Sequence, residues 1–201
     1  MILRSSPPSP FGRKVKIAAG VLGLTGRIEI VPADTNDASD ALRAQNPLGK
    51  IPTLVLDNGQ TLFDSRVILD YLDHLAGGGR IIPVQPDARF AALRMQALCD
   101  GIMDASILRV YEVRFRPEAA RHQPWLDYQA DKVARALSVL EAEDQALDPT
   151  PHVGQISLAC ALGYQDLRFS GTWRKSHPRL VAWLDRFAAQ VPAFEHTRVA
   201  A

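Results

Sequence analysis

The hydrophobic pattern of the sequence changes near residue 80. Before this point, short apolar runs alternate with segments of helical spacing. After it, apolar residues recur only at intervals of three and four, which is typical of amphipathic helices. Between the two parts, residues 77–86 hold three consecutive glycines and two prolines, a composition typical of a linker. This pattern predicts a first domain over residues 1–78, a linker over 79–86 and a second domain over 87–201.

The first part has the element order of a small mixed domain. Its extended runs are rich in β-branched and aliphatic residues, and Asp57-Asn58-Gly59 between the last two is a strong hairpin signal. The predicted strands are 1–4, 27–31, 46–56 and 60–63, and the predicted helices are 12–24 and 65–77. The order β-α-β followed by β-β-α indicates a thioredoxin-like domain.

The second part has no strand signal. A long helix is expected to begin after Asp87, which is a potential N-cap. The predicted helices are 88–115, 124–146, 158–169 and 179–190. The fold class is therefore α+β, with an N-terminal thioredoxin-like βαβ-ββα domain followed by an all-α helical bundle domain.

The composition excludes several classes of function. Of the 201 residues, 47% are hydrophobic and 22% are charged, and the net charge of +1 gives no basic surplus for nucleic acid. No apolar run reaches the length of about 20 residues that a membrane span needs, and no signal peptide pattern opens the chain. We therefore expect a cytoplasmic protein with no nucleic-acid or membrane partner.

Cysteine and histidine usage gives no sign of a disulfide or a metal centre. Cys99 and Cys160 both lie in helical patterns, where buried thiols are expected in a reducing compartment. The five histidines are far apart and lack the spacing of metal ligands. No metal is predicted.

Ser9 follows the first strand and precedes a helical stretch. It is a good N-cap, and Pro10 suits the first helical position because its missing N–H would have no intrahelical partner there. Disulfide-exchanging proteins of the thioredoxin-like kind carry Cys-x-x-Cys at this turn, whereas this chain has Ser9-Pro10-Phe11-Gly12. A redox role that needs a cysteine at this turn is therefore disfavoured.

Three motifs occur in a fixed order along the chain: SPFGRKVKI after the first strand, NPLGKIPTL in the middle and FDSRVILDYL at the end of the small domain. With the helical remainder, this set resembles the cytosolic glutathione S-transferases over nearly the whole chain. It is most similar to small bacterial members in which a serine or cysteine, rather than a tyrosine, faces the thiol of glutathione. The resemblance implies glutathione as cosubstrate, a small hydrophobic electrophile as acceptor, and a homodimer.

The resemblance gives Ser9 the catalytic role. A thiolate at the start of this helix would meet unpaired N–H groups, the positive end of the helix dipole and the Ser9 hydroxyl. Helix N-termini lower thiol pKa values from about 8.5 into the range of roughly 3.5 to 7.5. The alternative is that Ser9 is only a helix cap. Phe11 is expected to pack beside the thiol or at a subunit contact, with core packing as the alternative.

The resemblance also implies a set of glutathione-binding residues. A cis peptide bond between Ile51 and Pro52 would leave the Ile51 backbone free to pair with the cysteinyl unit, as an added strand does. Asp64 and Ser65 begin the last helix of the small domain and would bind the γ-glutamyl end, although a plain cap explains them almost as well. Lys50 would meet the glycyl carboxylate or remain a solvated surface residue.

The acceptor substrate is expected between the domains, against the long helix. Tyr111, Arg114 and Phe115 have helical spacing there and are the candidate pocket residues, although such spacing also suits simple packing. Either Asp100 or Asp104 corresponds to an acidic residue that reaches the partner subunit's glutathione in some relatives.

A helix-capping box is expected in the second domain. The resemblance places it at Ser157, but the acidic residue it needs three positions later is Cys160 here, so only the serine cap is predicted.

The sequence therefore predicts a glutathione transferase, an enzyme that conjugates glutathione to alkyl or aryl groups in detoxification. The alternative is a glutathione-binding or stress-response interaction protein with little or no transferase activity. A third reading is a glutathione-dependent isomerase of a diketo acid, but that class begins with Ser-Ser-Cys, which Ser5-Ser6-Pro7 does not match. There is no phosphate loop, dinucleotide glycine pattern or Gly-x-Ser-x-Gly elbow.

Overall fold

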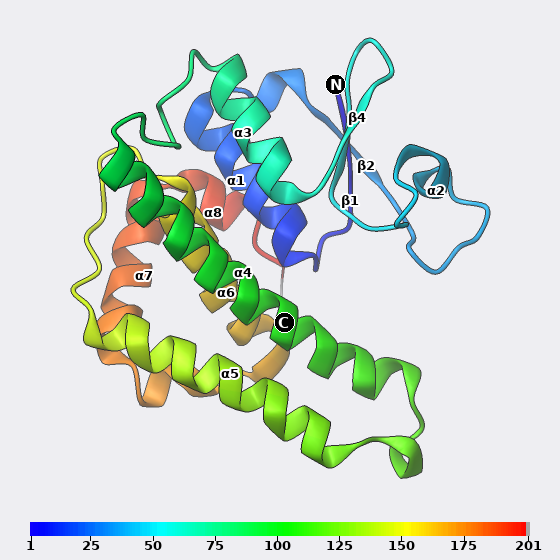
Figure 1. Ribbon diagram of the computed structural model, residues 1–201, viewed down its shortest axis with the longest axis vertical. Coiled ribbons are helices and arrows are strands. Elements are labelled where there is room, and N and C mark those ends of the chain that lie inside the picture. Colours follow the sequence, from blue (N-terminus) through cyan, green and yellow to red (C-terminus); the bar gives the residue numbers. More distant parts are fainter. Residues whose placement is uncertain (200–201) are drawn as a thin grey trace.

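Four short strands form one mixed sheet at the N-terminal end of the chain (Figure 1). The computed structural model describes residues 1–199, and its strands are β1 (Ile2–Ser5), β2 (Glu29–Pro32), β3 (Thr53–Val55) and β4 (Thr61–Leu62). Their order in the sheet is β2-β1-β3-β4, with β1 parallel to β2 and antiparallel to β3. The predicted thioredoxin-like order of elements is confirmed.

Helices make up the rest of the described chain. The small domain contains α1 (Pro10–Leu22), α2 (Leu42–Gln45) and α3 (Ser65–Leu75). The second part contains α4 (Pro86–Phe115), α5 (Gln123–Ala142), α6 (Val153–Phe169), α7 (Pro178–Gln190) and α8 (Pro192–His196), with short 3₁₀ turns at Thr25–Arg27, Glu118–Ala120 and Thr172–Lys175. The α+β class with a helical second part is therefore confirmed. No helix within residues 1–199 is both long and apolar enough to cross a membrane.

Helix α1 is the element that joins the sheet to the helical part. It packs against α3 on one side and against α6 and α8 on the other, and α4 runs past it in Figure 1. Gly20 allows the close approach of α8, because a Cβ there would lie 2.6 Å from the Cβ of Ala193. Apolar side chains from the sheet, α1, α3, α4, α6 and α7 form one continuous core.

The glycine-rich segment between the two parts is held by one carboxylate. Asp73, buried near the end of α3, accepts hydrogen bonds from the N–H groups of Gly79 (2.8 Å), Arg80 (2.9 Å) and Ile81 (2.7 Å). Gly79 is in the left-handed region, which glycine adopts without steric cost. The segment between α3 and α4 is therefore an ordered turn; the division at residues 79–86 remains a prediction.

Two predicted caps are wrong. Helix α4 is capped by Gln85, whose side chain accepts from the Ala88 N–H at 2.7 Å, and Asp87 lies inside the first turn. Helix α6 begins at Val153, five residues before the predicted start. Ser157 therefore lies within the helix, where its buried hydroxyl has no hydrogen-bond partner among the described residues.

The cap of α6 is His152. Its Nδ1 accepts hydrogen bonds from the N–H groups of Gly154 (3.1 Å) and Gln155 (3.3 Å), and the Gln155 side chain accepts from the His152 N–H at 3.1 Å. This is a reciprocal capping box built around a neutral imidazole. Burial lowers the pKa of His152, and Asp148 only partly offsets this effect.

The His152 cap makes stability depend on pH. The folded-state pKa lies below the unfolded value of about 6.5, so its contribution is complete above that pH and is lost as the pH falls toward the folded-state pKa. His152→Asn keeps a side-chain acceptor that does not titrate. From about pH 7.5 to about pH 5.5, the melting temperature should fall further for the wild type than for His152→Asn. Equal decreases would contradict the role of the imidazole.

Candidate functional site

The first turn of α1 is capped as the sequence predicts. Ser9 has extended backbone angles, and its Oγ accepts a hydrogen bond from the Gly12 N–H at 3.1 Å. Pro10 has no N–H to donate. The next donor of this turn is the Phe11 N–H, which has no partner among the described residues. The Ser9 hydroxyl accepts through a lone pair, so its proton remains free to be donated.

Gly12 allows α1 to start this close to the sheet. A Cβ at this position would collide with Oγ of Ser5, the last residue of β1. Phe11 is half-buried and packs against the core, with its ring centroid 5.5 Å from Nζ of Lys14. The start of α1 is therefore fixed directly above the end of β1.

The segment before β3 presents free backbone groups. The Ile51–Pro52 peptide bond is cis, as the resemblance implies; Phe63–Asp64 is also cis. Within residues 1–199, neither the N–H nor the C=O of Ile51 has a hydrogen-bond partner. The neighbouring Lys50 C=O is held by Asn46 Nδ2 at 2.9 Å and Thr53 Oγ1 at 3.0 Å, while the Lys50 side chain is exposed. Ile51 can therefore pair with an extended ligand.

The start of α3 is a second helix terminus with open donors. Asp64 is the N-cap, and its Oδ1 accepts from the Arg66 N–H at 2.9 Å. Ser65 is the first helical residue and is buried, and its N–H has no partner among the described residues. This terminus can bind a carboxylate, with the exposed Asp64 beside it as the partner for an ammonium group.

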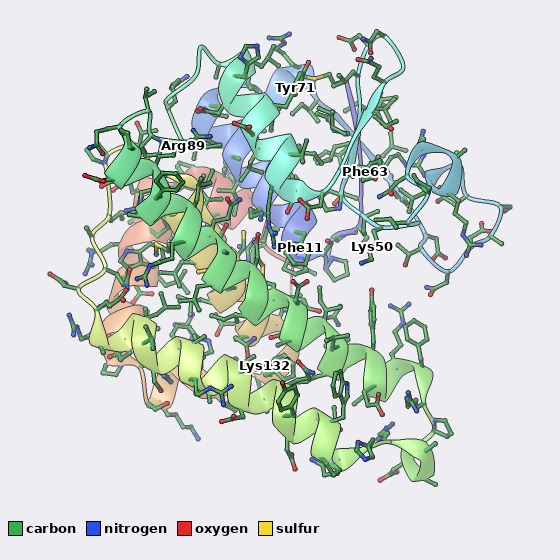
Figure 2. The ribbon with its side chains drawn as sticks, viewed as in Figure 1. Phe11, Lys50, Phe63, Tyr71, Arg89 and Lys132 are labelled. Carbon is green, nitrogen blue, oxygen red and sulfur yellow. The ribbon has the colours of Figure 1, made fainter. Side chains whose placement is uncertain are left out.

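Sheet topology brings these three segments to one edge. Strand β3 runs antiparallel to β1 with Thr53 opposite Arg4, so Pro52 lies beside the end of β1, from which the chain leads to Ser9. Strand β4 runs antiparallel to β3, so its exit toward Asp64 is at the same edge. Figure 2 shows Phe11, Lys50 and Phe63 around the region where α1 and α3 begin. The predicted residues of the small domain therefore surround one site.

Lys14, Arg66 and Asp100 form an ion network around the buried Asp100 carboxylate. The sequence does not predict the pairing of Asp100 with Lys14 and Arg66. Asp100 of α4 accepts from Lys14 Nζ through Oδ1 at 2.6 Å and from Arg66 Nε through Oδ2 at 2.8 Å. Lys14 and Asp100 are fully buried, so Asp100 is not available to a partner subunit's ligand. The one feature of the sequence that points to this network is Lys14, a lysine on the apolar side of the first helix.

Asp104 lies one turn further along α4. Burial and the charge of Asp100 raise its pKa, and Arg66 and Lys50 partly offset this effect. Opposite charges of the small domain and α4 therefore act on one another here.

The predicted acceptor residues lie on an exposed face of α4. Tyr111 and Phe115 have ring centroids 5.2 Å apart in an edge-to-face arrangement, and the Arg114 guanidinium lies 5.3 Å from the Phe115 ring. Tyr111 and Phe115 are on the same helical stripe as Asp104. A cavity of about 510 Å³ lies elsewhere and is lined by other residues, including Pro8, Arg13 and Tyr164.

The two thiols of the chain, Cys99 and Cys160, are buried. Burial raises the pKa of Cys160 to about 11 and that of Cys99 further, so both are protonated at neutral pH. Over the described part of the chain, no group of three or more histidine, cysteine, aspartate or glutamate side chains is placed to hold a metal ion.

The fold and site define a class of protein: a thioredoxin-like domain joined to a helical domain, with open helix termini and a free backbone segment at one sheet edge. The glutathione S-transferase N-terminal domain model matches residues 3–80, and the C-terminal domain model matches residues 117–186. The chain belongs to the glutathione S-transferase family.

Similar proteins cover nearly the whole chain. An uncharacterised GST-like protein of Escherichia coli, YibF, is 34% identical over 185 residues, 90% of each chain. A glutathione transferase family member from Pseudomonas fluorescens, solved with bound glutathione, has a TM-score of 0.90 and 43% identity, covering 100% of this chain and 99% of that one. A glutathione S-transferase from Methylobacillus flagellatus, solved with glutathione bound, has a TM-score of 0.91 and 31% identity, covering 99% of each chain.

The Ser9 cap has a measurable effect on stability. Ser9→Ala leaves the Gly12 N–H without its acceptor, which should lower the free energy of unfolding by about 1 kcal/mol. Ser9→Asn supplies another acceptor and should stay close to the wild type. Urea unfolding with an unchanged m-value measures the difference. An unaffected Ser9→Ala variant would show that this hydrogen bond contributes nothing.

Proposed function

We propose that the protein is a glutathione transferase that binds glutathione at the edge of its sheet, stabilises the thiolate and conjugates it to small hydrophobic electrophiles. The observation that carries this proposal is the convergence at one edge of the unpaired Phe11 N–H beside Ser9, the free backbone of Ile51 and the open N-terminus of α3. We further propose a cytoplasmic enzyme with a detoxifying role.

Each part of glutathione has a complementary group in this site. The γ-glutamyl carboxylate would accept hydrogen bonds from the N–H and hydroxyl of Ser65, with its ammonium beside Asp64. The cysteinyl backbone would pair with Ile51, ahead of the cis Pro52, as a short added strand. The exposed Lys50 is the candidate partner of the glycyl carboxylate. Support comes from the Pseudomonas and Methylobacillus family members, which were solved with glutathione bound.

Ser9 is the proposed activating residue. A sulfur at the start of α1 would accept from the free Phe11 N–H and from the Ser9 hydroxyl, and it would meet the positive end of the helix dipole. These interactions favour the thiolate over the thiol, and each unit of pKa reduction corresponds to about 1.4 kcal/mol. The thiolate then forms a carbon–sulfur bond to the electrophile as the leaving group departs.

The exposed stripe of α4 is the proposed acceptor surface. Tyr111 and Phe115 offer apolar ring faces, and Arg114 offers a positive charge beside them. A structure of a family member from Pseudomonas fluorescens has been solved with bound S-(propanoic acid)-glutathione.

A binding protein without turnover is the competing proposal. A stringent starvation protein A homologue from Coxiella burnetii is 38% identical over 89 residues, 44% of this chain and 41% of that protein. Such a protein would retain a glutathione site but would not need a lowered thiol pKa or an acceptor surface.

The thiol pKa separates these proposals. Glutathione should bind in calorimetric titration, and the ultraviolet thiolate signal of the complex should report a pKa well below the free value of about 8.5. In Ser9→Ala the bound thiol pKa should rise by about one unit or more, because the hydroxyl donor is lost. Turnover of an activated aryl halide should fall in parallel. Binding with an unshifted pKa and no turnover would favour the binding protein; absence of binding would refute the site itself.

A homodimer is the second part of this proposal. Three apolar side chains on α3, the turn after it and the start of α4 are highly exposed: Val67 (47%), Val84 (79%) and Phe90 (69%). Helices α3 and α4 both lie toward the viewer in Figure 1. Large exposed apolar side chains on such elements are typical of a subunit contact.

The dimer is tested by light scattering. The wild type should have twice the mass of the chain, and Phe90→Asp should shift it toward the monomer because a charge would be buried in the contact. Val139→Asp is the matched control, since Val139 is 46% exposed and lies on α5, not on α3, α4 or the turn between them. A monomeric wild type, or equal effects of both substitutions, would contradict the proposed contact.

A further inference from the structure

Among the helical residues that the structure describes, 86–199, Asp100 is the one that forms ion pairs with both small-domain helices of the proposed glutathione site. Its Oδ1 accepts from Lys14 Nζ of α1 at 2.6 Å, and its Oδ2 accepts from Arg66 Nε of α3 at 2.8 Å. The exposed fractions are 0% for Lys14 and Asp100 and 54% for the Arg66 side chain. The two oxygens of one carboxylate are thus divided between two helices.

Stability alone does not account for this network. Burying a charged lysine and aspartate carries a desolvation cost that their attraction often only balances, and apolar residues of similar volume are frequently as stabilising. An apolar contact between α1 and α4 would hold the two parts of the chain together. It would not fix the rotation of each helix as a directional, charge-assisted hydrogen bond does.

The two partners of Asp100 lie in or next to the helix turns of the proposed glutathione site. Lys14 follows the capped first turn of α1, and its ammonium lies 5.5 Å from the ring centroid of Phe11. Arg66 is the second residue of α3, and its own N–H donates to the Asp64 cap. Movement of either side chain would therefore shift a helix terminus whose free N–H groups face the ligand.

Arg66 is also held with part of its charge exposed. Only its Nε is engaged by Asp100, and the hydrogen bond to Asp100 raises its pKa. The charge of Arg66, like that of Lys50, acts on Asp104 of α4 and lowers its pKa, which burial and Asp100 raise. Fixing Arg66 there keeps positive potential beside Ser65, where a carboxylate would bind.

We infer that Asp100 is a positioning residue for glutathione: through Lys14 and Arg66 it fixes the starts of α1 and α3, so that the thiol and the γ-glutamyl carboxylate meet their donors together. This inference rests on the proposed glutathione site and adds to it a residue from the other domain, which touches neither the ligand nor the reacting sulfur.

The test compares Asp100→Asn with Asp166→Asn. Asp166 of α6 is the matched control, because its carboxylate also has two partners, Arg174 and Trp173, but they lie within the helical part. Both substitutions should lower the melting temperature. Only Asp100→Asn should raise the dissociation constant of glutathione, by about tenfold or more, which corresponds to the loss of one charge-assisted hydrogen bond.

Two further measurements distinguish a role of Asp100 in positioning the glutathione site from a role in fold stability alone. The pKa of the bound thiol should rise in Asp100→Asn and stay unchanged in Asp166→Asn, while Asp100→Glu should restore part of the affinity. If Asp100→Asn does not fold, the double variant Lys14→Met with Asp100→Leu replaces the buried pair by apolar groups; it should fold and still bind glutathione weakly.

The outcomes are distinct for the inference and for the proposed function. Asp100→Asn, or the folded double variant, with wild-type affinity and wild-type thiol pKa would overturn the positioning role while leaving the glutathione site intact. A wild-type protein that does not bind glutathione would refute the proposed function, and the positioning role would be refuted with it.

Discussion

Helix α1 is packed on both of its sides, and the position of every other part of the site depends on this packing. Gly12 brings its first turn against Ser5 of the sheet, and Gly20 brings its other end against Ala193 of α8. Neither contact leaves room for a Cβ, so the helix has little freedom to slide or rotate. The Ser9 turn is therefore held in one place relative to both the sheet and the helical part, as a preorganised binding site requires.

The sequence contains enough local information to predict the fold, while the residues of the glutathione site come from the family resemblance. The change from alternating to helical spacing and the Asp57-Asn58-Gly59 turn predict the sheet and its hairpin. Ser9, Pro52 and Ser65 each follow or precede a strand, and the strand directions bring them to one edge. The fold prediction is confirmed because it depends on backbone direction and not on side-chain packing; the roles of these residues stay predictions.

The features that sequence reasoning missed depend on distant partners. Lys14 is separated by 86 residues from Asp100, and Arg66 by 34, so no periodicity marks their pairing. The resemblance places the cap of α6 at Ser157, whereas the helix begins at Val153 and His152 is the residue that caps it. The sequence predicts an acceptor pocket between the domains at Tyr111, Arg114 and Phe115. The structure places Tyr111 and Phe115 on an exposed face of α4, and their role in acceptor binding stays a prediction.

Asp73 affects how easily the glycine-rich segment between the two parts of the chain opens to a protease. A run of three glycines usually marks a flexible joint that proteases cut readily. Here one buried carboxylate binds three successive N–H groups of that segment, and cleavage would require these hydrogen bonds to open together. The Asp73 carboxylate therefore restrains the joint between the two parts of the chain, and its hydrogen bonds oppose the opening that a protease needs.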